Sequence, residues 1–148
     1  MASGAYGIGL SHMAQGDFLW KAAGGSTIRA ALVNSTYTPN FDTDEFVSVI
    51  GTNRVDSAAA DVADEALTLA DPTVDTGNNE VELDATNPIT YSAIDTSQTA
   101  RAIAVFRFIT NDAASLLLTY NQFASDLSTN GSDVEVTFAA EGLLKFTY

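Results

Sequence analysis

The sequence predicts an all-β fold, an antiparallel β-sandwich or barrel of about eight to nine short strands with an N-terminal arm or short helix. Short segments of alternating apolar and polar residues recur along the 148 residues, and turn-forming residues separate them. Strands do not alternate regularly with helices, which excludes a fold built from βαβ units. This length suits one domain. We expect residues 1–16 to form the arm or helix and residues 17–148 to form a single β-sandwich domain.

The first element is expected from the spacing of three apolar side chains. Tyr6, Leu10 and Met13 follow one another at helical intervals, which predicts a short amphipathic helix near residues 5–15. Several glycines lie in the same segment, and each weakens a helix by about 1 kcal/mol relative to alanine. A flexible arm that docks on a partner is therefore the alternative.

The next segment predicts a short strand at 18–20, a Gly-Gly-Ser turn and a longer strand at 27–33. The following loop, residues 34–53, is rich in turn formers but carries many large apolar side chains, so we expect it to pack on the domain. Asp42 or Thr43 is positioned to cap a short helix over residues 43–50.

Period-two alternation predicts the remaining strands. They are expected at residues 66–70, 80–84, 89–93, 99–109, 115–120, 133–138 and 143–148. Residues 55–64 contain good helix formers without a clear period, and their structure is left open. The strand at 99–109 is apolar on both faces, so we expect it at the centre of the packed structure.

The composition excludes several classes of protein. The chain has no cysteine, which excludes a disulfide-rich scaffold and thiol catalysis and fits a reducing compartment. It has 6 basic and 19 acidic residues and a net charge of −13, so we expect no nucleic-acid partner. No apolar run is long enough to cross a membrane, and the first residues do not resemble a signal peptide. We therefore expect no membrane partner.

Residues suited to catalysis are sparse. His12 is the single histidine, and it lies in a glycine-rich segment where a rigid site is difficult to build. A zinc site needs more histidine or cysteine ligands than this chain has. Acidic clusters at 42–45, 61–65 and 80–84 suit calcium or paired catalytic carboxylates, but none has the spacing of an EF-hand. Glu80, Glu82 and Asp84 share one face of a strand, which we interpret as a solvated face, and we expect no enzymatic activity, no cofactor and no metal.

Two arginines are expected in the central strand. Arg101 and Arg107 are an even number of residues apart, so an unbroken strand directs both side chains to the same face. A buried guanidinium needs an acidic partner. We expect that partner inside the fold, and a contact with another subunit is the alternative.

A layout of packing and turn residues covers residues 16–55. It contains Gly-Asp-Phe-Leu-Trp at 16–20, Arg-Ala-Ala-Leu-Val at 29–33 and Tyr-Thr-Pro-Asn-Phe-Asp-Thr-Asp-Glu-Phe at 37–46. This layout resembles a family of small structural proteins from tailed bacteriophages, with patterns of the type G-x-[IF]-x-W, K-[VA]-A-L-[LV] and Y-T-P-x-x-D-T-x-x-[FY]. The Ala/Val-rich strand at 100–109 and the closing hairpin also fit. The chain departs from the pattern at Arg29 and Ala30, where many relatives carry Lys-Val or Lys-Ala, and in its Gly-Gly-Ser turn.

The resemblance implies a virion component and carries no catalytic motif. Within that class we expect a capsid decoration (cement) protein, a homotrimer that binds the major capsid protein on the outer surface of the head shell. Its location would be the capsid exterior, after assembly in the host cytoplasm. An acidic exterior agrees with this role, since it keeps the free protein soluble and repels DNA.

The candidate interface residues are the large apolar side chains of the N-terminal segment and the long loop, because a few desolvated anchors dominate most interfaces. They are Tyr6, Leu10, Met13, Phe18, Trp20, Tyr37, Phe41 and Phe46. For Phe41 and Phe46 a place in the core of the domain is the favoured interpretation. For Tyr6, Leu10 and Met13 the interface is favoured.

Two other functions stay open. A tail or baseplate module would contact a host glycan through a groove lined by Trp20 and tyrosine side chains. A glycoside hydrolase would bring two acidic side chains together in a cleft. Such clefts usually contain several tryptophans, and this chain has one.

Overall fold

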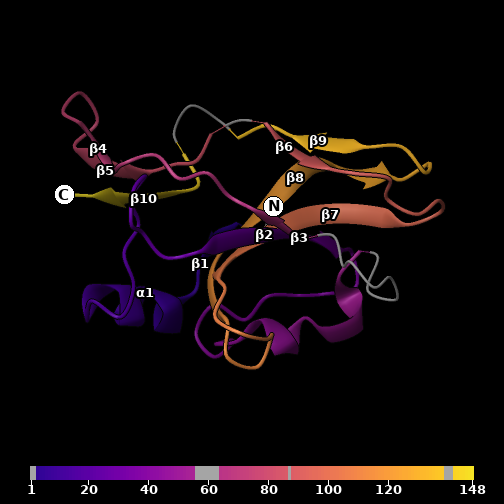
Figure 1. Ribbon diagram of the computed structural model, residues 1–148, viewed down its shortest axis with the longest axis horizontal. Helices are drawn as coiled ribbons and strands as arrows, with labels where there is room; N and C mark the ends of the chain where they lie inside the picture. The colour runs from indigo at the N-terminus through magenta and orange to yellow at the C-terminus, as the bar shows by residue number, and fades with distance from the viewer. Residues whose placement is uncertain (1–2, 56–63, 87, 139–141) are drawn as a thin grey trace.

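The computed structural model describes residues 3–55, 64–86, 88–138 and 142–148. The described chain is mostly β-structure in antiparallel sheets, with a single α-helix and two short 3₁₀ helices, which confirms the predicted all-β class. The sheets formed by these residues are open (Figure 1). The barrel that the sequence also allowed is therefore not formed.

The largest sheet has five strands in the order β1-β8-β7-β2-β3, and all neighbouring strands are antiparallel. Its strands are β1 (Gly4–Ala5), β2 (Ile28–Asn34), β3 (Asp64–Ala66), β7 (Thr99–Arg107) and β8 (Leu116–Ser128). The three long strands form the centre, and the two shortest strands form the edges. Short edge strands limit pairing with other chains.

Two smaller sheets come from the second half of the chain. β4 (Thr73–Asp75), β5 (Glu80–Leu83) and β10 (Leu144–Thr147) pair in the order β10-β5-β4, and β6 (Ile89–Tyr91) pairs with β9 (Val134–Val136). In Figure 1 the three-stranded sheet lies at the left-hand end of the molecule and the two-stranded sheet at the upper right. Both small sheets join segments that are far apart in the sequence.

The helix predicted near residues 5–15 is present as α1 (Gly7–Ala14). It approaches β8 so closely that a Cβ atom at Gly9 would lie 2.0 Å from the carbonyl oxygen of Leu117. Only glycine fits this approach without a shift of the backbone. None of the described helices is long and apolar enough to cross a membrane.

Two 3₁₀ helices, η1 (Val47–Val49) and η2 (Gly51–Asn53), replace the short helix that the sequence predicted over 43–50. Neither helix has a side-chain cap, so the capping role predicted for Asp42 or Thr43 is wrong. Large apolar side chains of this segment are buried in the core.

Apolar side chains cover both faces of the five-stranded sheet, as the sequence of its central strand predicted. Ile103 and Val105 of β7 belong to one buried cluster, and Ala104 and Phe106 belong to another. Because successive side chains of a strand point to opposite faces, the two clusters lie on the two sides of the sheet.

The two faces have different covers. The two smaller sheets complete the first cluster through the buried side chains Leu83, Ile89, Tyr91, Val134 and Val136. The N-terminal segment and the loop that follows β2 complete the second cluster through Tyr6, Tyr37, Val47 and Ile50. The loop over 34–53 therefore packs on the domain, as its apolar content predicted.

The strand predicted at 18–20 is not formed. Phe18 and Trp20 are buried, but the backbone of Leu19 is hydrogen-bonded to Ser26 within a loop. Burial in the core explains the apolar sequence of this segment. An apolar run this short carries no information that separates a buried loop from a strand.

Other strands differ from their predicted bounds. The segment predicted as one strand over 66–70 is divided, because β3 ends at Ala66 and Leu69 makes an isolated bridge to Ala85. β4 was not predicted, because Val74 is its only apolar residue and one residue cannot show the period-two alternation of a strand. β8 continues well beyond its predicted end because β7 pairs with it as far as Ser128. No structure was predicted for residues 55–64, and residues 56–63 lie outside the described part of the chain.

Candidate docking surface

A row of apolar side chains crosses the outer part of the three-stranded sheet. Val81 of β5 pairs directly with Val74 of β4 on one side and with Phe146 of β10 on the other. Direct partners in antiparallel strands place their side chains on the same face. Tyr148 follows two residues later, and its backbone N–H donates to the carbonyl oxygen of Asn79 at 2.9 Å, so it continues this row. Val74, Val81, Phe146 and Tyr148 are called the apolar strip below.

Three of the four residues of the apolar strip are exposed and Val81 is half-buried, although the strip continues a buried row. Leu83 and Leu144, the next pair on the same face, contact the first core cluster. Beyond this pair the exposed fractions rise to 61% for Val74, 37% for Phe146 and 67% for Tyr148. Single exposed apolar residues are common on proteins, whereas a contiguous group is typical of an interaction site.

Carboxylates lie next to the apolar strip in the chain. Asp75 follows the strip residue of β4, and Glu80 and Glu82 flank the strip residue of β5. Lys145 in β10 is the cation nearest to them in the sheet, and its Nζ lies 3.1 Å from an oxygen of Glu80. Because successive side chains of a strand point to opposite faces, these carboxylates lie on the face of the three-stranded sheet opposite to the strip, and negative charge dominates there.

Hydrogen bonds hold two of these carboxylates in place. Asp75 accepts bonds from the Asn78 side-chain amide at 2.7 Å and from the Gly77 backbone N–H at 2.7 Å. These bonds favour the charged form and lower the pKa of Asp75. Glu82 accepts a bond from the Thr73 hydroxyl at 3.3 Å. Within the described part of the chain neither carboxylate has a cationic partner within 4.0 Å.

The predicted interface residues of the N-terminal segment lie in the core or at its margin. Tyr6 is fully buried, and its ring centroid lies 5.3 Å from that of Phe41. Tyr6 therefore offers no contact area to a partner, and this part of the interface prediction is corrected. Leu10 and Met13 are half-buried, with Met13 packed against the first core cluster. Their role at an interface stays a prediction.

Phe18 and Trp20 are core residues, so neither has free surface for a partner or a glycan. The Trp20 Nε1–H donates to the carbonyl oxygen of Asp84 at 3.1 Å. The Phe18 ring lies 5.7 Å from the guanidinium carbon of Arg107. Both side chains fill the first core cluster, where their size contributes to the packing of the domain.

The three remaining candidates lie in the loop that covers the second face. Tyr37 belongs to the second cluster and Phe41 packs against it, which confirms the interpretation of Phe41 as a core residue. Phe46 is half-buried and makes an isolated bridge to Leu116 of β8. Burial of Tyr37 removes it from the candidate interface for the same reason as Tyr6.

A tyrosine pair fixes the N-terminal segment to this loop. The hydroxyl oxygens of Tyr6 and Tyr37 are 3.0 Å apart, and the Tyr37 hydroxyl donates to Asp44 at 2.7 Å. Since Tyr37 has one proton to donate, Tyr6 donates to Tyr37. Burial, followed by the bonds with Tyr6 and Asp44, raises the pKa of Tyr37 far above its ordinary value, and burial does the same for Tyr6. Both hydroxyls are therefore protonated at neutral pH.

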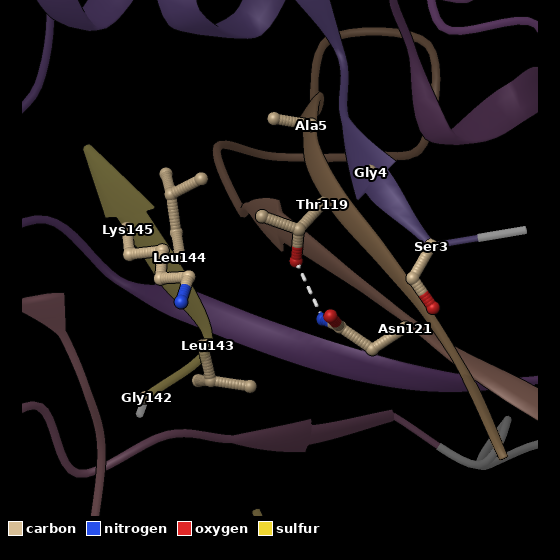
Figure 2. Close-up of a pocket in the computed structure, with 9 residues that line it drawn as sticks. All are labelled: Ser3, Gly4, Ala5, Thr119, Asn121, Gly142, Leu143, Leu144 and Lys145. Carbon is tan, nitrogen blue, oxygen red and sulfur yellow. Dashed lines mark hydrogen bonds between the residues drawn. The ribbon is translucent and has the colours of Figure 1, made fainter. Parts of the chain in front are cut away.

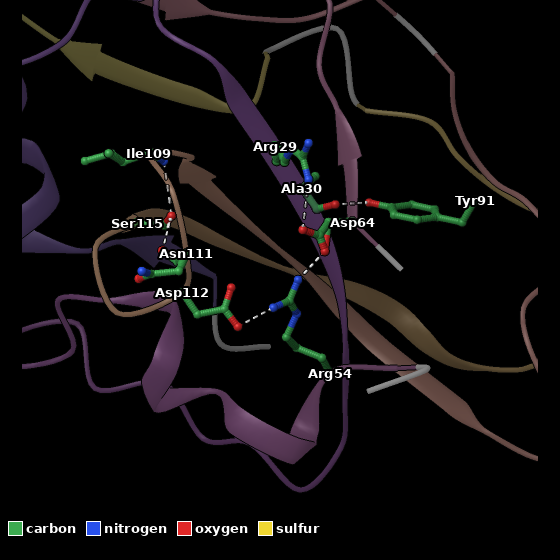
Figure 3. Close-up of polar contacts among 9 residues, drawn as sticks. All are labelled: Arg29, Ala30, Arg54, Asp64, Tyr91, Ile109, Asn111, Asp112 and Ser115. Carbon is green, nitrogen blue, oxygen red and sulfur yellow. Dashed lines mark hydrogen bonds and ion pairs between the residues drawn. The ribbon is translucent and has the colours of Figure 1, made fainter. Parts of the chain in front are cut away.

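A second polar network joins one edge of the five-stranded sheet to the loop after β7 (Figure 3). The buried guanidinium of Arg54 bonds to Asp64 and, at 2.6 Å, to Asp112. Arg29 Nη1 lies 3.5 Å from Asp64, and the Arg29 guanidinium lies 4.2 Å from the centroid of the Phe108 ring. The network connects segments that are distant in sequence, so it has a structural role that sequence analysis did not find.

The two arginines of β7 are held by different partners. Arg101 donates to both carboxylate oxygens of Asp126, at 2.9 and 2.8 Å, so its acidic partner belongs to the same chain, but the pair is more than one-third exposed and the expected burial is wrong. Arg107 instead lies over the Phe18 ring. A bulge between Ala100 and Ala102 interrupts the alternation on which a common face was predicted.

A pocket of about 460 Å³ lies between β10 and the edge formed by β1 and β8 (Figure 2). Its polar side chains include those of Thr119, Asn121 and Lys145, and the Asn121 amide donates to the Thr119 hydroxyl at 2.9 Å. Its lining contains neither a carboxylate nor an aromatic ring. The pocket therefore lacks the acid pair of a glycoside hydrolase and the stacking surface of a glycan site.

In the acidic cluster at 61–65, residues 61–63 lie outside the described part of the chain, and in the cluster at 42–45 Glu45 contacts the single histidine. His12 Nδ1 lies 2.5 Å from Asp17, and its Nε2 lies 3.8 Å from Glu45, so this histidine links α1 to the loop before η1. Among the residues that the structure describes, no group of three or more histidine, aspartate and glutamate side chains is placed to hold a metal ion. Residues 80–84 are partly buried, whereas a solvated face was predicted. The partners of Glu80 and Glu82 described above account for this burial.

Sequence analysis did not find the apolar strip. The sequence contains part of the information. Alternation in residues 80–84 separates Val81 from its charged neighbours, and alternation in residues 143–148 places Phe146 on the opposite face from Lys145. The sequence does not show that these two strands pair with each other. It also does not show that the small sheet extends past the side chains that cover it.

Comparison with protein-family models, with curated proteins and with solved structures finds no match.

Proposed function

We propose that the protein is a capsid decoration (cement) protein, a virion structural protein that binds the outer surface of the head shell and stabilises it. The resemblance of residues 16–55 to small structural proteins of tailed bacteriophages supports this proposal. The partner is then the major capsid protein, and the location is the capsid exterior after assembly in the host cytoplasm. The role requires no catalytic step, no cofactor and no nucleic acid.

The exposed apolar strip is the observation that carries the proposal. Burial of apolar surface contributes about 25 cal/mol per Å², and aromatic side chains are typical anchors of protein interfaces. Phe146 and Tyr148 are aromatic and exposed, and Val74 stands beside them on the same face. A protein that binds a shell needs such a surface on a rigid support. The paired strands of the three-stranded sheet supply that support.

Two finer features belong to the same proposal. The five-stranded sheet and the two smaller sheets act as the two layers of a β-sandwich, with the apolar strip at one end of the smaller layer. A homotrimer would present several strips to the shell at once. Multiple linked contacts raise the overall affinity without any new interaction at each site.

Rebinding to heads tests the proposal. Purified protein is added to phage heads that lack it, and bound protein is measured after sedimentation. We expect binding, and we expect the decorated heads to resist heat at a higher temperature than bare heads. A Val74→Ser/Phe146→Ser double variant should lose binding. Leu19→Ser, at an apolar residue that is 53% exposed and does not belong to the apolar strip, should retain it.

Two results contradict the proposal. One is the absence of binding to such heads at micromolar concentration, and the other is equal binding by the double variant. Circular dichroism shows whether each variant is folded. Immunogold labelling of virions locates the protein directly, and a label at the tail would support a tail or baseplate module instead of a decoration protein.

A further inference from the structure

We propose that an extended protein segment, in which apolar residues alternate with lysine or arginine, adds to the free edge of β4 and places its apolar residues beside Val74, at the end of the apolar strip. The occupant is a different protein from this chain. The inference deepens the proposed function and rests on it only in assigning the segment to a protein of the phage head. The chemistry of the segment is argued from this chain alone.

The charge of the three-stranded sheet selects a basic partner. The segments that form the three-stranded sheet, residues 71–84 and 142–148, contain five carboxylates and one lysine. The carboxylates are those of Asp71, Asp75, Glu80, Glu82 and Asp84. Lys145 is already paired with Glu80. Apolar contact and positive charge are therefore both complementary to this surface.

The same charge opposes a second copy of the chain at this site. Each copy carries a net charge of −13, and pairing of two β4 strands edge to edge would bring the acidic polar faces of two small sheets side by side. Charges interact over about 10 Å at 0.1 M salt, so the carboxylates of one sheet would repel those of the second copy. A partner rich in lysine or arginine experiences attraction in the same geometry.

The two edges of the sheet differ in a way that favours β4. Within the described residues, both β4 and β10 are edge strands, and no described strand pairs with the outer side of either one. Lys145 occupies the polar face of β10 and would repel a basic residue placed beside it. Thr73 and Asp75 occupy the polar face of β4, and Val74 occupies its apolar face. A strand beside β4 would thus align its apolar residues with Val74 and its basic residues with Asp75.

An extended segment matches this arrangement because its side chains alternate between two faces. Strand addition supplies backbone hydrogen bonds for affinity, and alternate side chains supply specificity. Val74 is 61% exposed in the free protein, so an added strand finds its apolar partner uncovered. The added residues would extend the apolar strip by one further strand.

Nuclear magnetic resonance with a defined probe tests this inference apart from the head. The probe is a short synthetic peptide of alternating lysine and valine, added to the isotope-labelled protein. We expect the largest amide shifts at residues 73–75, with smaller shifts at 80–83, and we expect binding to weaken as NaCl rises. A peptide of alternating glutamate and valine and one of alternating lysine and serine should each bind at least about tenfold more weakly, which equals about 1.4 kcal/mol.

Three variants separate the contributions. Val74→Ser should weaken binding of the lysine–valine peptide about tenfold, since it removes the apolar contact at the edge. Glu82→Gln should weaken it several-fold, because it removes a charge and keeps a hydrogen-bond acceptor for Thr73. Leu19→Ser should leave binding unchanged and serves as the matched control.

Several results would overturn the inference. They are equal binding of the glutamate–valine peptide, shifts centred on β10, and unchanged binding by Val74→Ser. Self-association of the wild-type protein would also overturn it, if sedimentation at rising NaCl detects that association and Val74→Ser abolishes it. Failure of the proposed function is distinguishable, because the peptide then binds while heads do not. The opposite result is that the protein binds heads at all NaCl concentrations while none of the peptides binds the protein. That result would contradict this inference and would remain consistent with the decoration role.

Discussion

The five-stranded sheet and the three-stranded sheet use the same kinds of residues with different results. In the larger sheet, apolar side chains on both faces are covered, so Ile103 on one face and Phe106 on the other are fully buried. In the smaller sheet, cover ends after the Leu83–Leu144 pair, and Phe146 is 37% exposed. The difference shows that alternation in a strand identifies an apolar face. Whether that face is core or binding surface depends on what lies over it.

A matched pair of phenylalanines gives the largest expected effect. Phe106→Ala should lower the free energy of unfolding by about 3–5 kcal/mol, because it leaves a cavity in a closed core. Phe146→Ala should lower it far less, since its side chain is partly exposed in the folded protein. Urea denaturation of both variants measures the two values. Equal losses would show that the three-stranded sheet is as well covered as the larger one.

A matched pair of cations should give the next largest difference. Arg54→Met removes the cation that Asp64 and Asp112 share, and removal of one member of a buried ion pair costs about 3 kcal/mol or more. Lys145→Met breaks a more exposed pair with Glu80, and such pairs contribute about 1 kcal/mol or less. Thermal unfolding compares the two variants at one pH. A larger loss for Lys145→Met would reverse the ranking of the two sheets.

Two glycines of α1 test how tightly the larger sheet is covered. Gly9→Ala should destabilise the protein by about 1–2 kcal/mol, because overpacking against Leu117 costs more than the roughly 1 kcal/mol gained in helix propensity. At Gly7 an added Cβ would meet only the Phe41 carbonyl oxygen at 3.6 Å, an ordinary contact. Gly7→Ala should therefore be neutral or stabilising. Stabilisation by both variants would mean that α1 does not cover β8 closely.

Replacement of two tyrosines by phenylalanine should give the smallest difference in stability. One of the two replacements should also change how stability depends on pH. Tyr37→Phe leaves Asp44 and Tyr6 without their shared partner and should cost about 1 kcal/mol, whereas Tyr148→Phe should cost nothing measurable. The pKa of Tyr37 is raised in the folded protein from its ordinary value of 10.0. The unfolded chain therefore loses this proton first, and stability should fall as pH rises above about 10.

Denaturant curves at neutral and alkaline pH measure this effect. The fall in stability above that pH should be shallower in Tyr37→Phe than in the wild-type protein. It should be unchanged in Tyr148→Phe. Identical alkaline profiles for all three proteins would contradict the described environment of Tyr37.

Much of the fold was predictable because it depends on local pattern. The strands at 80–84, 89–93, 99–109, 133–138 and 143–148 are present within two residues of their predicted bounds. The central position of β7 followed from its two apolar faces. Such features need only the period of two and the cost of exposing large apolar side chains.

The candidate site was not predictable in the same way. Tyr6, Phe18, Trp20 and Tyr37 are large and apolar, and the sequence does not distinguish a core anchor from an interface anchor. The common face expected for Arg101 and Arg107 was lost through a bulge, which changes the direction of side chains without a clear sequence signal. Asp64 and Arg54 meet across strands, and no local pattern reports that meeting.

By itself, the sequence determined that this protein is acidic, mostly β and built around one strand with two apolar faces. These properties follow from composition and short-range alternation, which every local segment carries. Only the tertiary structure decided which aromatic side chains are buried and which form the apolar strip. Exposure is set by long-range strand pairing and by the extent of the cover, and both depend on segments far apart in the chain.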